Sequence, residues 1–134
     1  VLQDYQTTRL SLKNHPMHFL RPVHARRGII PAKEATTLSN GRRVQTSGVV
    51  LVRQRPGTAS GVVFITLEDE TGVANLVVWP RVMERFRAAV MRSRIIHVKG
   101  RVQTAENVTH IVAEQILDCT ADLQLLSEDA LHDP

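Results

Sequence analysis

The chain has 134 residues, of which 43% are hydrophobic, and no apolar run reaches the roughly 20 residues of a membrane span. Lysine and arginine outnumber aspartate and glutamate by 17 to 13, and the pI near 10.0 favours anionic partners. The single cysteine, Cys119, excludes an internal disulfide and fits a reducing cytoplasm. The length predicts one domain with an appendage. Because Val1 leads directly into a polar segment, we expect an excerpt of a longer protein.

Residues 1–41 are predicted to form a connector with short helices that packs on the domain after it. Three prolines exclude one long helix, but short helices are expected over residues 16–28 and 31–38. The segment has too many apolar side chains for a free linker. These side chains are Leu10, Leu12, Met17, Phe19, Leu20, Ile29 and Ile30.

From residue 42 to residue 117 the hydrophobic period becomes two, which predicts strands. Gly48, inside the first strand, is expected to permit a bend or bulge. Asp69 and Gly72 supply the turn of a hairpin. Strands are expected at 43–54, as a hairpin within 61–80, at 94–103 and at 109–117, with one amphipathic helix at 80–92.

Five short strands with a helix between the third and the fourth form the element order of the OB-fold, a mainly β, five-stranded barrel. We therefore predict an OB-fold domain over residues 42–117, preceded by the connector and followed by an acidic tail, 118–134, that frays from Asp118. Such barrels commonly bind oligonucleotides across strands two and three and the loops that follow strands one and four. Fold alone does not settle function, because one fold serves many functions.

Two stretches of this sequence resemble a known family. VRQRPGTASGVVFITLEDETG, within the run from Gly48 to Gly72, and the following RVMERFR resemble the C-terminal OB region of the error-prone, damage-inducible bacterial C-family DNA polymerases, relatives of the replicative α subunit. The upstream DYQTTRLSLKNHPMHFLR is similar to the segment that leads into that domain. The resemblance implies a non-catalytic module of a translesion polymerase, acting at the nucleoid in a bacterial cytoplasm. The nucleotidyltransferase centre of such a DNA-directed DNA polymerase lies upstream.

The alternation places Phe64 on the outward face of the second strand, where OB barrels stack bases on aromatic rings. Packing under the connector or against a neighbouring domain is an equal alternative for this side chain. Asn75 and Val77 are expected beside it, with Asn75 able to hydrogen-bond a base or a sugar. Trp79 is expected to be a core or edge plug.

Four cationic residues are candidates for phosphate contacts. Arg53 and Arg55 flank the loop after the first strand, whose glycines leave it free to approach a nucleic-acid strand. Lys99 and Arg101 share one face of the fourth strand and fit a phosphate groove and a solvated surface equally well. The aromatic content of 4% predicts weak binding to single-stranded DNA, effective when the rest of a polymerase holds the template.

Two other functions stay open. A protein-docking module would use the same exposed apolar groups to join partners that the resemblance implies, a polymerase-like clamp adaptor and a RecA-like accessory protein. The looser pattern F-x-x-L-x-D-x-x-G also occurs in anticodon-binding OB domains of aminoacyl-tRNA synthetases. In each case we expect the isolated domain to be monomeric.

No catalytic, metal or cofactor site is predicted in this chain. Glu68–Glu70 are expected to be turn acids at a solvated hairpin tip and not Mg²⁺ ligands. Gln124–Leu126 lacks the aromatic residue of a clamp-binding peptide and is assigned to the tail. The histidines of the connector have no cysteine or acid at a familiar metal spacing, so we expect structural or solvent-exposed roles. They are His15, His18 and His24.

Overall fold

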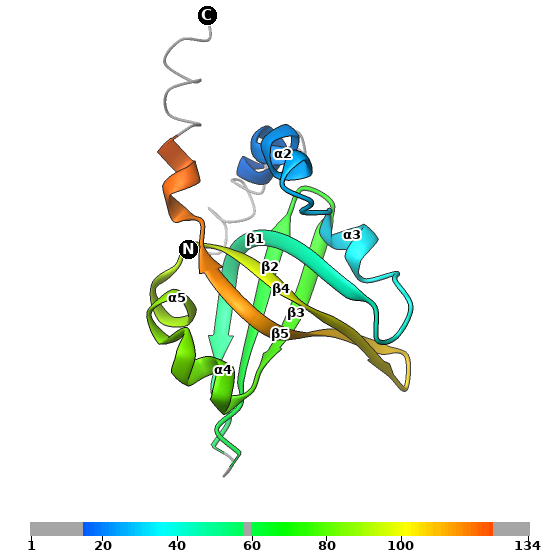
Figure 1. Cartoon of the computed structure of the whole chain (residues 1–134), viewed down its shortest axis with the longest axis vertical. Coiled ribbons are helices and arrows are strands. Elements are labelled where there is room, and N and C mark those ends of the chain that lie inside the picture. The colour runs from blue at the N-terminus through cyan, green and yellow to red at the C-terminus, as the bar shows by residue number, and fades with distance from the viewer. Residues whose placement is uncertain (1–14, 58–59, 125–134) are drawn as a thin grey trace, which may run out of the picture.

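The computed structural model describes residues 15–57 and 60–124, which include a closed five-stranded barrel with the strand order β1-β2-β3-β5-β4 (Figure 1). Neighbouring strands are antiparallel except β3 and β5, which pair in parallel through Leu76 with Ile111 and Val77 with Val112. The predicted OB-fold is confirmed. The strands are β1 (Arg43–Gln54), β2 (Val63–Asp69), β3 (Gly72–Val78), β4 (Ile95–Ala105) and β5 (Val108–Asp118).

Side chains that alternate along each strand fill the barrel. In β2, Val63, Ile65 and Leu67 are at most 3% exposed, while Phe64 and Thr66 between them are half-buried. Each fully buried Ile or Leu contributes about 1.5–3 kcal/mol to folding. The fourth strand contributes the inward set that the sequence predicts: Ile96, Val98, Gly100 and Val102.

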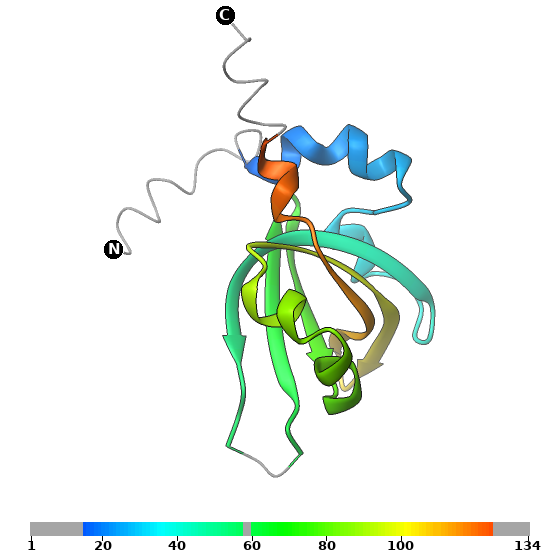
Figure 2. The same ribbon diagram turned by 60° about the vertical axis from the view of Figure 1, so that its left-hand side comes forward.

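Short helices cover the two ends of this core (Figures 1 and 2). At the end with the β2–β3 turn, α3 (Ala32–Ala35) inserts Ala32 and Ala35 into the core cluster. At the other end, α4 (Pro80–Arg85) and α5 (Arg87–Arg92) insert Met83 and Val90. The first of these helices is shorter than the 31–38 segment that the sequence predicts.

The segment after β3 is two helices, so the prediction of one helix is wrong. Phe86, between α4 and α5, has φ −118° and ψ 32°, outside the helical region. The predicted apolar face nevertheless packs on the core throughout: Val82, Met83, Phe86, Ala89 and Val90. Because these residues keep helical spacing on both sides of the break, the sequence pattern does not reveal it.

The bulge of β1 lies at Leu51 and not at Gly48. The other form of the expectation, a bend near Gly48, agrees with the pairing, because β1 changes partner from β4 to β2 around Val49. The pairing of β1 with β2 shifts between Val50 and Val52, which leaves Leu51 as an extra residue. A Cβ atom at Gly48 would lie 2.8 Å from the backbone oxygen of Glu68. Glycine is therefore needed there for the close approach of β2 to β1.

The connector runs along β1. Ile30 forms a parallel bridge with Thr46, and its N–H donates to the backbone oxygen of Gln45 at 2.9 Å. The Thr46 hydroxyl donates to the backbone oxygen of Ile30 at 2.7 Å. Before this bridge, α2 (Pro16–Arg26) packs Met17 and Leu20 against β4, and Pro22 lies inside it as the sequence predicts.

The segment after β5 is bound to α2 up to its short 3-10 helix, η2 (Thr120–Asp122). Asp122 accepts hydrogen bonds from His24 Nε2 at 2.9 Å and from Arg27 Nη1 at 3.1 Å. The expectation of fraying from Asp118 is therefore wrong for this stretch. The expected packing of Leu10 and Leu12 on the barrel, and the assignment of Leu125 and Leu126 to the tail, concern residues outside the described ranges.

The carboxylate of Asp69 joins the tip of the β2–β3 hairpin to the connector. Its Oδ1 accepts from the backbone and hydroxyl of Thr71, at 2.8 and 2.7 Å, and from the N–H of Gly72 at 3.2 Å. Its Oδ2 accepts from the N–H of Ala32 at 2.7 Å and from Arg21 Nη2 at 3.0 Å. The predicted turn chemistry of Asp69 is present, and the same side chain also anchors the connector.

Arg21 bridges the two buried acids of the tip. Its Nε and Nη2 donate to the two carboxylate oxygens of Glu70 at 2.8 and 2.9 Å. Burial is the largest single effect on Glu70 and opposes its ionisation, but the hydrogen bond and charge of Arg21, together with a backbone hydrogen bond, outweigh it, and the pKa of Glu70 is lowered. Asp69 and Glu70 are only 2% and 8% exposed, so the expectation of a solvated acidic tip is wrong. Their balancing cation lies 48 and 49 residues away in sequence, where no local signal reveals it.

Replacing Arg21 with glutamine removes the cation between two buried carboxylates. We expect Arg21→Gln to lower the free energy of unfolding at pH 7 by about 2–3 kcal/mol, just below the range of about 3–5 kcal/mol for a fully buried pair, because the guanidinium is partly solvated. The shift of the urea midpoint measures this loss. Arg101→Gln is the matched control: its pair with Glu114 is 46% exposed on both sides, and we expect a change below about 1 kcal/mol. Equal losses would contradict the assignment.

Candidate nucleic-acid interface

Phe64 lies on the outward face of β2, as the alternation predicts. Its partner on β3 is Val77, whose partner on β5 is Val112. Two residues before Val112 on the same side of β5, His110 contacts Phe64, with ring centroids 6.4 Å apart and planes at 58°. Val77, which lies between Phe64 and Val112 in the row of paired strand residues, is 8% exposed. Sequence analysis missed His110, because nothing local indicates that β5 pairs with β3.

Asn75 lies on the same outward side of β3, two residues before Val77. It is exposed, and its Oδ1 accepts from the Thr66 hydroxyl at 2.9 Å across the hairpin. This bond orients the amide and leaves its NH₂ group without a bond to any described residue. Phe64, Asn75 and Val77 thus come together on one surface, which carries an aromatic ring and an amide NH₂ group.

Trp79 is 49% exposed, so the expectation of a core or edge plug is wrong. It follows Val78, which is fully buried, and its backbone is still extended, with φ −73° and ψ 156°. The alternation of β3 therefore continues for one residue and directs Trp79 to the side of Asn75 and Val77. The spacing of these three residues is a signal that the sequence analysis could have used.

Arg53 is separated from the other candidates. The bulge at Leu51 reverses the alternation, so Arg53 pairs with Ile65 and takes the core-facing side of β1. Its Nε donates to the backbone oxygen of Val90 at 2.6 Å, and its Nη2 donates to that of Ser93. These oxygens lie at the end of α5, where the helix has free carbonyls that a cation stabilises.

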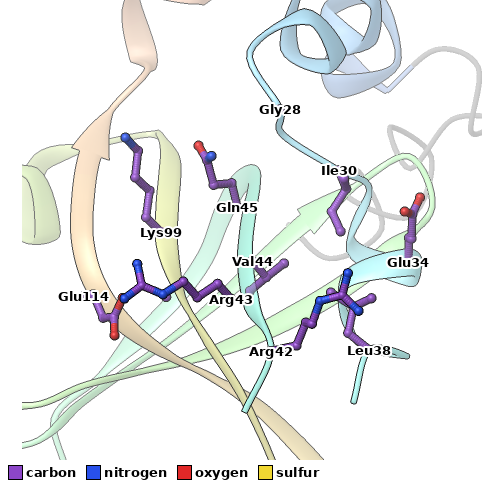
Figure 3. A pocket seen from close by; sticks show the side chains of 11 residues that line it. Gly28, Ile30, Glu34, Leu38, Arg42, Arg43, Val44, Gln45, Lys99 and Glu114 are labelled. Atoms are coloured by element: carbon purple, nitrogen blue, oxygen red, sulfur yellow. The ribbon is translucent and has the colours of Figure 1, made fainter. Parts of the chain in front are cut away.

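The remaining cationic candidates lie at three different places. Arg55 is exposed at the start of the loop after β1. Arg101 pairs with Val112, on the outward side of β4, and donates to Glu114 at 3.2 Å and to the backbone oxygen of Gly41 at 3.3 Å. Lys99 lines a cavity on the side of the connector (Figure 3).

The histidines of the connector contact other side chains of the fold. In the ranges that the structure describes, no three His, Cys, Asp or Glu side chains are arranged to hold a metal ion, and no helix is long and apolar enough to cross a membrane. Burial, together with nearby Asp122, raises the pKa of the Cys119 thiol to about 11. The histidine contacts are His15 with Glu68, His18 with Phe19, and His24 with Ser47 and Asp122.

The geometry so far defines a small barrel with an aromatic and amide surface of the kind that binds nucleic acid. The sequence profile described as "OB-fold nucleic acid binding domain" matches residues 44–118, more than half of the chain. The chain therefore belongs to this family.

Curated relatives with high identity are named error-prone DNA polymerase. The chain is 58% identical over 132 residues to the one from Bradyrhizobium sp. strain ORS 278 and 53% identical over 129 residues to the one from Caulobacter vibrioides. These matches cover 98% and 96% of this chain but only 11% and 12% of the relatives. The resemblance found in the sequence is confirmed, and the chain spans about an eighth of the length of these proteins.

Solved structures share the fold at lower identity. The asparaginyl-tRNA synthetase of Pyrococcus horikoshii complexed with asparaginyl-adenylate matches with a TM-score of 0.58 and 23% identity, over 68% of this chain and 22% of that one. An aspartyl-tRNA synthetase from Entamoeba histolytica matches with 0.54 and 16%, over 66% and 20%. At such identities the likeness supports the barrel fold alone.

Burial of His97, on the outward side of β4, makes the stability of the fold depend on pH. It is 7% exposed and contacts Gln45 Oε1 at 2.9 Å; burial, with a smaller effect of the Lys99 charge, lowers its pKa from 6.5 to about 4. Below pH 6.5 His97 therefore takes up a proton in the unfolded chain, whereas in the folded chain it stays neutral until about pH 4. The free energy of unfolding consequently falls as the pH drops from about 6.5 to 4. Between pH 7.5 and 4.5 we expect the wild type to lose about 2–3 kcal/mol more than His97→Gln. Urea titrations at both pH values measure this, and parallel losses would contradict it.

Proposed function

We propose that the chain is a non-catalytic module that binds single-stranded template DNA weakly on the outward face of β2 and β3. The observation that carries the proposal is the placement of Phe64, His110 and Trp79 on this side, beside the free amide of Asn75. Stacking of a base on an aromatic ring contributes about 1–3 kcal/mol and tolerates any sequence. The family match supports a nucleic-acid ligand.

The position of the connector supports an accessible face. Among the described residues, the hydrogen bonds from connector to barrel go to the hairpin tip, to β1, and to β4 near its end, and none goes to Phe64, Asn75 or Val77. The sequence left open the alternative that Phe64 packs under the connector. These contacts give that alternative no support.

The names of the relatives support a role in error-prone DNA synthesis, with polymerisation catalysed by other parts of a longer protein. The proposal that this synthesis is induced by DNA damage rests on the resemblance of the sequence. The module is proposed to act as a monomer at the nucleoid of a bacterial cytoplasm. Few stacking rings and a formal net charge of +4 favour weak intrinsic affinity. A tethered polymerase supplies the effective concentration that such a weak site needs.

Fluorescence anisotropy with a labelled single-stranded oligonucleotide of about 12 nucleotides tests the proposal. We expect salt-dependent binding that Phe64→Ala or Trp79→Ala weakens about 5- to 150-fold, the loss of one stacked base. Phe19→Ala is the matched control, because Phe19 is an aromatic residue 52% exposed on α2, away from this face. We expect no change from it. No binding by the wild type at low salt, or equal losses in all three variants, would reject the proposal.

A protein-docking module is the second candidate, with a polymerase-like clamp adaptor or a RecA-like accessory protein as partner. Four large apolar side chains at the ends of β1 and β3 and on α5 favour it, since each is at least 39% exposed: Leu51, Val52, Trp79 and Met91. A stable complex with the adaptor, lost in Met91→Ala and retained in Phe64→Ala, would identify this role.

An anticodon-binding domain is the remaining alternative. A preference for tRNA over single-stranded DNA in the anisotropy assay would identify it.

A further inference from the structure

A cavity of about 370 Å³ lies between the connector and the outer surface of β1 and β4 (Figure 3). Gly28, Ile30 and Leu38 form its connector wall, and the first residues of β1 form the opposite wall. The bridge between Ile30 and Thr46 fixes the distance between the walls. The cavity is therefore part of the fold and is built jointly by connector and barrel.

Cationic side chains dominate the polar lining of this cavity. Arg42, Arg43 and Lys99 line it, against the carboxylates of Glu34 and Glu114. Within residues 15–57 and 60–124, Glu114 is paired with an arginine outside the lining, whereas none of the three lining cations is within ion-pair distance of a carboxylate. Figure 3 shows Arg43 and Lys99 on one side of the cavity and Arg42 on the other. The lining thus keeps uncompensated positive charge.

A continuous row of paired residues connects this cavity to the aromatic face. Phe64 pairs with Val77, Val77 with Val112, Val112 with Arg101, and Arg101 with Arg43. All five face outward, so the row forms a path around the outside of the barrel. Four strand spacings of about 4.8 Å give it a length of roughly 19 Å. One OB-fold accommodates about 4–16 nucleotides, so a single strand can cover this path.

We propose that the cavity binds a backbone phosphate of the same single strand whose bases stack on the β2–β3 face, an inference that rests on the proposed function. The strand leaves Phe64, crosses β5 and β4 past Arg101, and ends at the connector. Arg42 and Arg43 hold the phosphodiester oxygens through charge-assisted hydrogen bonds, and Lys99 adds a third positive charge. The connector is then part of the binding site and not only a link to the barrel.

The length dependence of binding tests this inference. Single strands of about 2 and about 14 nucleotides are titrated into the whole chain, since two nucleotides are below the size of an OB-fold site and only the longer strand covers both the face and the cavity. We expect Arg43→Gln to weaken binding of the longer strand about tenfold and that of the shorter strand less than twofold. For the longer strand, the slope of log K against log salt is negative. Its magnitude should decrease by about 0.7 in Arg43→Gln and by about twice that in Arg42→Gln/Arg43→Gln.

Two variants separate this inference from the proposed function. Arg87→Gln removes an exposed cation on α5, at the other end of the barrel, and should change neither affinity. Phe64→Ala should weaken both lengths. If Phe64→Ala weakens binding while Arg43→Gln leaves the longer strand unaffected, or weakens both lengths equally, the cavity proposal is overturned and the function stands. If the wild type binds neither strand, both are overturned.

Inorganic phosphate distinguishes a backbone site from a site for free phosphate. Titrations are repeated with phosphate in place of chloride at equal ionic strength. For a backbone site we expect the advantage of the longer strand to persist in both salts. Loss of this advantage in phosphate, in the wild type but not in Arg43→Gln, would assign the cavity to free phosphate and overturn the inference.

Discussion

Burial of the Asp69 carboxylate is the constraint on which the arrangement of the molecule depends. Three of its five hydrogen bonds come from its own hairpin turn, and two come from the connector, through Arg21 and the N–H of Ala32. A buried carboxylate costs several kcal/mol unless it is paired and hydrogen-bonded, so the turn alone does not satisfy this one. The barrel needs the connector to complete its hairpin tip, and the two are better regarded as one folded unit than as a domain with a linker.

The same docking decides which surfaces stay accessible. Arg21 and Ala32 bring the connector to the hairpin tip, and the bridge of Ile30 to Thr46 then directs it along β1. The outward face around Phe64, toward the other end of β2, makes none of these contacts. On the other side, the connector lies against β1 and β4 and encloses the basic cavity. The buried acids of the hairpin tip thus hold the connector away from the Phe64 face and beside the cavity.

Much of this fold could be read from the sequence, because a barrel strand has one buried and one outward face and a period of two records that directly. The position of Phe64 followed from that rule. The rule failed where backbone geometry changes the phase: the extra residue at Leu51 turns Arg53 inward, and no residue type in that stretch signals it. It failed at Asp69 for another reason, since its partner Arg21 is distant in the chain and turn acids are usually solvated. The expectation for Trp79 was wrong because it followed the general tendency of tryptophan to be buried. The alternation of β3 places the side chain on the outward face, where it is exposed.

The cations of this chain divide into those used by the fold and those left for a ligand, which is why a net charge overstates what a binding site has available. Arg21 neutralises two buried acids, Arg53 binds the carbonyls at the end of α5, and Arg27 holds Asp122. These side chains are fixed by internal partners and would lose them on contacting a phosphate. The lining cations Arg42, Arg43 and Lys99 have no such partner among the described residues, and the fold concentrates them in one cavity. The positive charge that remains for a ligand is therefore local, which is why the proposed strand follows one path around the barrel.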